Sequence, residues 1–117
     1  MNDRTTISTH VLDTALGQPA PGISVMLERI ETDGTHRHVS SSVTDAEGRI
    51  VGLASAHANL PAGTYRLTFD VEPYFRAMQR ATFYTRVQVD FRIAGEPQHY
   101  HVPLLLSPFG YSTYRGT

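Results

Sequence analysis

Hydrophobic and polar residues alternate along much of this 117-residue chain, in the pattern that β-strands produce. The clearest alternations lie at 6–13, 23–28, 65–71 and 87–93. Because successive side chains of a strand point to opposite faces, each stretch is expected to bury one face and expose the other. The stretch 36–44 is mostly polar, which predicts an exposed strand or a strand at a sheet edge.

The predicted strand at 6–13 separates two kinds of side chain. One face carries Ile7, Thr9 and Val11, and the other carries Ser8, His10 and Leu12. His10 is therefore expected on the face opposite Ile7 and Val11.

Turn residues separate the strands and set where the chain reverses. Asp33 and Gly34 are typical of a hairpin turn. The residues 45–48 predict a second turn, which delivers Arg49 to a short strand that ends near Leu53. The stretch 54–63 reads as a loop.

One short helix is expected among the strands. Pro73 fits the first turn of a helix, and residues 74–81 favour two helical turns. Seven or eight short strands separated by turns, with one helix, predict a two-sheet β-sandwich that forms a single domain over 1–117.

The segment 99–117 carries two histidines, three tyrosines and an arginine around a short apolar run. Pro103 cannot donate a hydrogen bond to a neighbouring strand, which indicates an edge strand or a bulge. The turn residues at 107–110 predict that 111–115 returns as a second strand. The result is a hairpin that carries His101, Tyr114 and Arg115. The alternative interpretation is a terminal hairpin with ordinary surface histidines.

Composition excludes several classes of chemistry. The chain has no cysteine and no lysine, so thiolate nucleophiles, cysteine metal sites and Schiff-base chemistry are absent. The formal net charge of -1 provides no general attraction to nucleic acid or to anionic membranes. No apolar run reaches the length of a membrane span, and the first ten residues do not resemble a signal peptide, so a cytoplasmic location is expected.

The histidines offer two candidate sites. His36 and His38, and likewise His99 and His101, share a strand face at a spacing that can chelate zinc. The sequence indicates no third ligand, so exposed or hydrogen-bonded histidines are the alternative. Serines are present, but without the Gly-x-Ser-x-Gly pattern of a nucleophile elbow. Catalysis by a Ser/His/Asp set stays open, but the most natural enzymatic option is water activated by histidine, with an arginine stabilising the developing oxyanion.

Three segments together resemble the 5-hydroxyisourate hydrolases, the transthyretin-related enzymes of urate breakdown. They are STHVLDTALGQPAPGISVML at 8–27, TDAEGRI at 44–50 and HYHVPLLLSPFGYSTYRGT at 99–117. Their order and spacing match along nearly the whole chain. The resemblance implies a transthyretin-like β-sandwich of two four-stranded sheets with one short helix.

The resemblance also implies a site. By motif position the catalytic residues are His10, Arg49 and His101, and the substrate-binding residues are Tyr114, Arg115, Gly116 and Thr117. The histidines are expected to activate water against the C6 carbonyl of 5-hydroxyisourate, while Arg49 holds the substrate and stabilises the oxyanion. The product implied is 2-oxo-4-hydroxy-4-carboxy-5-ureidoimidazoline, and no metal or cofactor is expected. Thr117 stands where the family usually ends in serine.

The assembly implied is a homotetramer, a dimer of dimers, with the sites at the dimer–dimer interface. No nucleic acid or membrane partner is expected. One alternative is a transthyretin-like carrier that binds a hydrophobic ligand in the same channel. Another is a structural or adhesion sandwich, for which His10→Ala would change nothing except stability.

Overall fold

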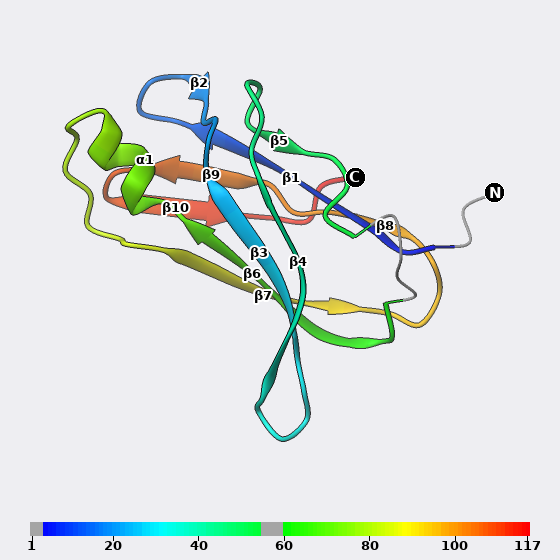
Figure 1. Ribbon diagram of the computed structural model, residues 1–117. Helices are drawn as coiled ribbons and strands as arrows, with labels where there is room; N and C mark the ends of the chain where they lie inside the picture. The colour runs from blue at the N-terminus through cyan, green and yellow to red at the C-terminus, as the bar shows by residue number, and fades with distance from the viewer. Residues whose placement is uncertain (1–3, 55–59) are drawn as a thin grey trace.

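The computed structural model describes residues 4–54 and 60–117, which form two β-sheets stacked face to face with one helix at one end (Figure 1). The strands are β1 Thr6–Asp13, β2 Gln18–Pro19, β3 Ser24–Ile30, β4 His36–Val43, β5 Arg49–Ile50, β6 Gly63–Asp70, β7 Val87–Ile93, β8 His99–His101, β9 Leu104–Ser107 and β10 Gly110–Thr113; the helix α1 is Glu72–Ala77. The predicted β-sandwich with one short helix is confirmed.

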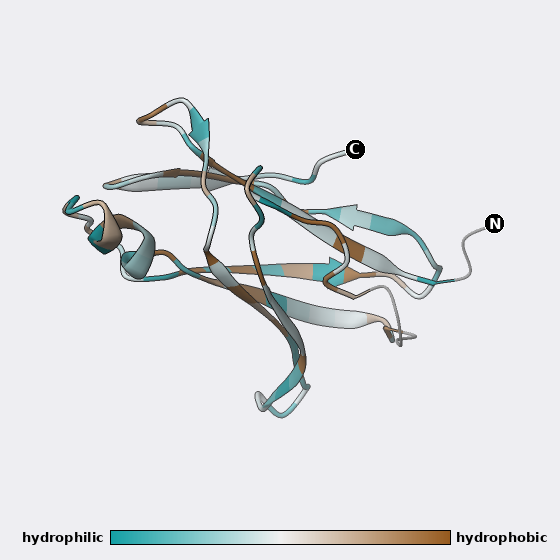
Figure 2. Cartoon of the chain, turned by 45° about the horizontal axis from the view of Figure 1, so that its top comes forward, coloured by the Kyte–Doolittle hydropathy of each residue, from teal (hydrophilic) through white to brown (hydrophobic). Residues whose placement is uncertain are grey.

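The first sheet is antiparallel, with strand order β4-β3-β6-β7. The polar strand β4 lies at its edge, as its sequence predicts. The turn at Asp33 and Gly34 closes the hairpin of β3 and β4, which extends beyond the rest of the molecule (Figure 1). The tip of this hairpin is largely hydrophilic (Figure 2).

The second sheet is built around β1, and its six segments occupy four strand positions. On one side of β1, β8 and β9 follow each other as parallel partners, and β10 pairs with β9. On the other side, β5 and then β2 pair with β1. The sheet is therefore four strands wide, and two of its positions are interrupted.

Pro103 lies at one of these interruptions, so the prediction of an edge strand is wrong for this segment. The strand β9 lies between β1 and β10. Because proline cannot donate to a neighbour, the ladder breaks between β8 and β9. Side chains bond the backbone carbonyls there: Thr9 Oγ1 donates to Val102 O at 2.6 Å and Thr113 Oγ1 donates to Pro103 O at 2.6 Å.

The helix is shorter than its sequence predicts, because α1 ends at Ala77 and not at Ala81. Gln79 has a φ of 55°, in the left-handed region, which a right-handed helix cannot include. The next residue, Arg80, turns back and pairs with buried Asp13 of β1 at 2.7 Å. Within the described part of the chain, no helix has the length and hydrophobicity to span a membrane.

Two strand ends also differ from the prediction. The strand β5 ends at Ile50, and beyond it the N–H of Leu53 donates to Ile7 O at 3.0 Å. The returning strand β10 ends at Thr113. Beyond it, Gly116 forms a bridge to His101. Residues 55–59 of the predicted loop at 54–63 lie outside the described residues, and Gly63 already belongs to β6.

The core lies between the sheets and takes the inward residues of both. Fully buried side chains include Ile7, Val11, Leu27, Tyr65, Leu67, Phe69, Phe75, Ile93 and Leu104. Each contributes about 1.5–3 kcal/mol by leaving water. This packing makes a rigid support for the outer face of β1, β5 and β8.

Candidate active site

The three predicted catalytic residues lie on the outer face of the second sheet. His10 of β1 and Arg49 of β5 are directly opposite each other in the strand register. Ser8, two residues before His10 on the same face, is opposite His101 of β8. Because residues at i and i+2 share a strand face, β1 brings the partners of both neighbouring strands together.

A pocket of about 300 Å³ opens on this face. Its lining comes from β1, β5, β8 and the C-terminal residue, and consists of Ser8, Thr9, Arg49, Ile50, Val51, His99, His101 and Thr117. Two imidazoles, a guanidinium and three hydroxyl side chains therefore line one small volume. Such a set provides a base and an oxyanion-stabilising cation at one place.

His101 is fixed from two sides. Its Nδ1 lies 2.8 Å from Ser8 Oγ. Its backbone oxygen accepts the N–H of Gly116 at 2.8 Å. Among the described residues, its other ring nitrogen, Nε2, has no hydrogen-bond partner. The ring is thus held through one nitrogen and keeps the second for chemistry.

The electrostatic environment favours a neutral His101. Burial is the largest cause, and it lowers the pKa of His101 below its ordinary value of 6.5. Electrostatic interactions with His99, His10 and Arg49 lower this pKa further, while a hydrogen bond to Ser8 acts in the opposite direction. A neutral imidazole is the form that accepts a proton from water.

His10 is oriented by the turn before β5. Its Nε2 donates to the backbone oxygen of Glu47 at 2.9 Å, so the proton lies on Nε2 and Nδ1 is left as an acceptor. Asp45 holds this turn by accepting the N–H groups of Glu47 and Arg49, each at 2.9 Å. The bond from the Arg49 N–H is the largest cause that lowers the pKa of the Asp45 carboxyl.

Gly48 lets the turn pass close to β1. Its φ is 75°, and a Cβ there would lie 2.4 Å from the backbone oxygen of Val11. The Arg49 side chain that follows is about half exposed, with one loose ion pair from Nε to Glu47 Oε2 at 3.8 Å. Its guanidinium is therefore accessible to a ligand.

The predicted substrate-binding residues divide into two groups. Gly116 and Thr117 lie at the His101 pocket. Tyr114 and Arg115 line a separate pocket of about 280 Å³ next to β7. Arg115 stacks over the ring of Tyr100 at 4.9 Å and donates to Gln98 Oε1 at 2.8 Å.

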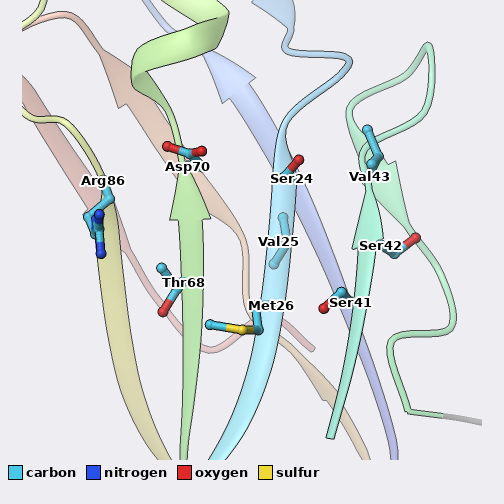
Figure 3. Close-up of a pocket in the computed structure, with 9 residues that line it drawn as sticks. All are labelled: Ser24, Val25, Met26, Ser41, Ser42, Val43, Thr68, Asp70 and Arg86. Atoms are coloured by element: carbon cyan, nitrogen blue, oxygen red, sulfur yellow. The ribbon is translucent and has the colours of Figure 1, made fainter. Parts of the chain in front are cut away.

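A larger groove, of about 480 Å³, lies on the outer face of the other sheet (Figure 3). Serine and threonine side chains from β3, β4 and β6 line it, with Asp70 and Arg86 as its ionisable groups. It contains no histidine, so it lacks the base that the His101 pocket provides.

The described residues contain no group of three or more side chains placed to hold a metal ion. In the predicted pair on β4, His36 faces Glu28 and His38 contacts Ser41 Oγ at 2.7 Å. In the pair on β8, both nitrogens of His99 already contact hydroxyl groups.

Comparison with known proteins assigns the family. Residues 7–116 match the model of the HIUase/Transthyretin family. The chain belongs to this family. It is 47% identical to 5-hydroxyisourate hydrolase 2 of Rhizobium meliloti over 116 residues, which cover 95% of each chain.

Two solved structures show how closely this family member keeps the fold. The 5-hydroxyisourate hydrolase of Klebsiella pneumoniae superposes with a TM-score of 0.83 at 42% identity, covering 97% of this chain and all of that one. Sea bream transthyretin in complex with thyroxine superposes with a TM-score of 0.88 at 32% identity, covering 96% and 95%. The fold is thus shared with a protein named as a hydrolase and with a protein named as a transthyretin.

Sequence reasoning did not place Ser8 in the site and considered His99 only as a possible zinc ligand, although both line the pocket of this HIUase/Transthyretin family member. Alternation along 6–13 already placed Ser8 on the face of His10. The contact between Ser8 and the two β8 histidines depends on the parallel pairing of β1 with β8, which links residues more than ninety positions apart.

Proposed function

We propose that this chain is a 5-hydroxyisourate hydrolase that opens the six-membered ring to 2-oxo-4-hydroxy-4-carboxy-5-ureidoimidazoline. The observation that carries the proposal is the strand register that places His10, Arg49 and His101 on one outer face of the sheet, where Arg49 and His101 line the pocket. The near full-length similarity to named 5-hydroxyisourate hydrolases supports the choice of substrate.

In the proposed reaction His101 is the general base. The oxygen of a water molecule attacks the C6 carbonyl carbon, and the water proton passes to Nε2 of His101. The carbonyl electron pair moves onto oxygen. When the tetrahedral intermediate collapses, the ring C–N bond at this carbon breaks and the leaving nitrogen takes the proton from His101. The free Nε2 and the lowered pKa of His101 both support this role.

The other two residues act on the water and on the charge. His10 presents Nδ1 as an acceptor, because its Nε2 proton is held by Glu47, and it orders the attacking water. Arg49 places a permanent cation beside the carbonyl oxygen that becomes negative. A charge that is positioned before the reaction stabilises the transition state without reorganisation.

The proposed assembly is a homotetramer, a dimer of dimers, with the sites at the dimer–dimer interface. This arrangement gives a reason for polar side chains of β1, β5 and β8 that point away from the core of their own chain. Tyr114 and Arg115 are proposed to contact the substrate only after assembly, since in one chain they line a different pocket.

A transthyretin-like carrier is the second candidate, because the fold similarity to a thyroxine complex is high. Against this function stands the lining of the pocket, which presents two imidazoles and a guanidinium. A carrier pocket for a hydrophobic ligand is lined mainly by apolar side chains.

The ultraviolet decay of freshly generated 5-hydroxyisourate separates these candidates. The compound hydrolyses unaided, so the quantity measured is the rate in excess of a protein-free control. Wild type and a histidine variant outside the site, His38→Asn, are expected to accelerate the decay. His101→Asn and Arg49→Ala, if folded, are expected to lose about 100-fold or more of that excess rate. A folded wild type that matches the protein-free control would exclude the hydrolase.

A further inference from the structure

A row of side chains continues behind His101 on the outer face of the sheet. Ser8 Oγ lies 2.8 Å from Nδ1 of His101 and 3.0 Å from Nε2 of His99. Nδ1 of His99 in turn lies 2.6 Å from Thr6 Oγ1. Four side chains from two strands thus form one continuous chain of hydrogen bonds that starts at the pocket.

The row is built into the register of the parallel strands. Thr6 is paired with His99, and Ser8 is paired with His101, so each hydroxyl of β1 faces an imidazole of β8. The two rings stack with an interplanar angle of 15° and a centroid distance of 6.5 Å. The Ser8 residue between them is buried, which keeps water from replacing its hydroxyl.

The hydrogen atoms of this row are interdependent. A hydroxyl has one proton to donate, and a neutral imidazole has one N–H and one acceptor nitrogen. If His101 donates through Nδ1 to Ser8, then Ser8 donates to His99, and His99 donates to Thr6. If Ser8 donates to His101, every bond in the row is reversed. The tautomers of the two histidines are therefore linked through Ser8.

This link matters because His101 lies close to a permanent cation. Arg49 approaches from β5, and the imidazoles of His10 and His99 approach from β1 and β8. A proton that stays on His101 creates an imidazolium among these groups. A reversal of the row removes that charge, because it moves a second proton away from the pocket.

We propose that Thr6, His99 and Ser8 form a proton relay behind His101, an inference that rests on the proposed function. As Nε2 of His101 takes a proton from the attacking water, its Nδ1 proton passes to Ser8 Oγ. The Ser8 proton passes to Nε2 of His99, whose Nδ1 proton passes to Thr6 Oγ1, and the Thr6 hydroxyl releases its proton to solvent. One proton enters and one leaves, and each member stays neutral. When Nε2 of His101 gives its proton to the leaving nitrogen, the row runs in reverse: Thr6 takes a proton from solvent and Ser8 returns a proton to Nδ1 of His101. In this relay Ser8 and His99 are positioning residues that act through His101.

Ser8→Ala tests the relay by removing the bridging hydroxyl. Its kcat for 5-hydroxyisourate is expected to fall by about 10- to 100-fold, part of the effect of a general base, while KM stays near wild type. Ser8→Thr, which keeps a hydroxyl, is expected to retain most of kcat. Ser41→Ala is the matched control, since it removes a serine that contacts His38 outside the pocket at 2.7 Å.

Two further readings separate a relay from a merely structural contact. The double variant Ser8→Ala/His99→Phe is expected to lose no more kcat than Ser8→Ala alone, because either change breaks the same row. In mixtures of light and heavy water, wild type is expected to show a curved dependence of rate on deuterium content, and Ser8→Ala a linear one. Three results would overturn the relay. They are a kcat loss in the double variant equal to the product of the two single losses, a linear dependence of the wild-type rate on deuterium content, or an effect of Ser8→Ala on KM alone.

The relay and the proposed function fail in different ways. If wild type and Ser41→Ala accelerate the decay and Ser8→Ala does so equally, the relay alone is wrong. If wild type does not accelerate the decay, the proposed function is wrong. Imidazole ¹⁵N NMR then tests whether the row of hydrogen bonds exists. Ser8→Ala is expected to shift the ring nitrogen signals of both His99 and His101. Unchanged His99 signals would show that the row is not continuous.

Discussion

At the scale of single residues, Gly116 packs its backbone against the imidazole of His101 and leaves no space for a side chain. A Cβ there would lie 2.5 Å from Cδ2 of the ring. Gly116→Ala is therefore expected to displace the His101 ring and lower kcat/KM by about 10- to 100-fold, the range for a small misplacement of a catalytic group. Thermal unfolding should change little. Decay assays and melting curves measure the two effects.

Gly95→Ala is the matched control for this substitution. A Cβ at Gly95 meets no atom within 4 Å, so its activity should equal that of wild type. An active Gly116→Ala would show that the contact with Gly116 does not set the position of His101.

The ionisation of His101 provides a second prediction. Since burial and nearby cations lower the pKa of His101, the neutral base persists to more acidic pH than a free histidine would. The acid limb of kcat/KM should therefore lie below pH 6.5. Arg49→Ala is expected to raise this pKa in an NMR titration without restoring the ordinary value, because burial is the larger cause. The control Arg37→Ala, near the hairpin tip, should leave the pKa of His101 unchanged. An acid limb of kcat/KM above pH 6.5 in wild type would contradict the assignment of His101 as the base.

Part of the geometry of the candidate site could be predicted from sequence, because strand alternation is local information. Alternation places His10 on the face of β1 opposite Ile7 and Val11, and it places His101 on the face of β8 opposite Tyr100 and Val102. The catalytic roles came only from the resemblance to the 5-hydroxyisourate hydrolases. The contacts of Ser8 and Gly116 with His101 could not be predicted, since they arise from strand pairing and chain return over long separations.

At the scale of elements, Asp13 joins β1 to the segment of α1. Its carboxylate is fully buried and accepts hydrogen bonds from Tyr74 at 2.8 Å and from Arg80 at 2.7 Å. Burial raises the pKa of Asp13, but the bonds from Arg80, Tyr74 and the Leu16 N–H outweigh it and hold the pKa below 3.8. Burial and the bond to Asp13 raise the pKa of Tyr74 to about 12.

Asp13→Asn is expected to lower the free energy of unfolding at pH 7 by about 3 kcal/mol, because it removes one partner of a buried ion pair. A depressed carboxyl pKa stabilises the fold above the unfolded pKa, and this contribution is lost as pH falls through the folded pKa. The difference in the free energy of unfolding between wild type and variant, measured by urea denaturation, should therefore shrink below pH 3.8. Exposed Asp70→Asn is the control. A difference that stays constant with pH would contradict this role for the carboxylate.

The same contact limits what could be predicted about the elements. Strong alternation gave the bounds of β1 and β7 correctly, because a half-buried strand has a clear period. Helix propensity predicted that the helix continues to Ala81. Propensity is a local property, so it contains no information about the ion pair between Arg80 and Asp13. Tertiary contacts overrode local preference at this helix end.

At the scale of the whole molecule, an aromatic patch lies beside the edge strands β7 and β10. It consists of Phe83, Tyr84, Phe109 and Tyr111, and Phe83 and Phe109 are 72% and 70% exposed. The ring of Tyr84 packs edge-on against Phe83, at a centroid distance of 5.0 Å, and against Tyr111, at 5.2 Å. Contiguous exposed aromatics next to unpaired strand edges are typical of an interface. The patch therefore supports the proposed assembly through these edges.

Phe83→Ser is expected to shift the protein from a species of four 13.0 kDa chains to smaller ones, measured by sedimentation velocity. If the site is completed by assembly, the excess decay rate per chain should fall by about tenfold or more at the same concentration. Val43→Ser, which changes an exposed residue of β4, should alter neither the sedimentation nor the decay rate. Tyr114 and Arg115 connect the two readouts, because one chain alone keeps them away from His101. A dissociated Phe83→Ser variant with full activity would show that each chain holds a complete site, and it would leave these two residues without the proposed contact to substrate.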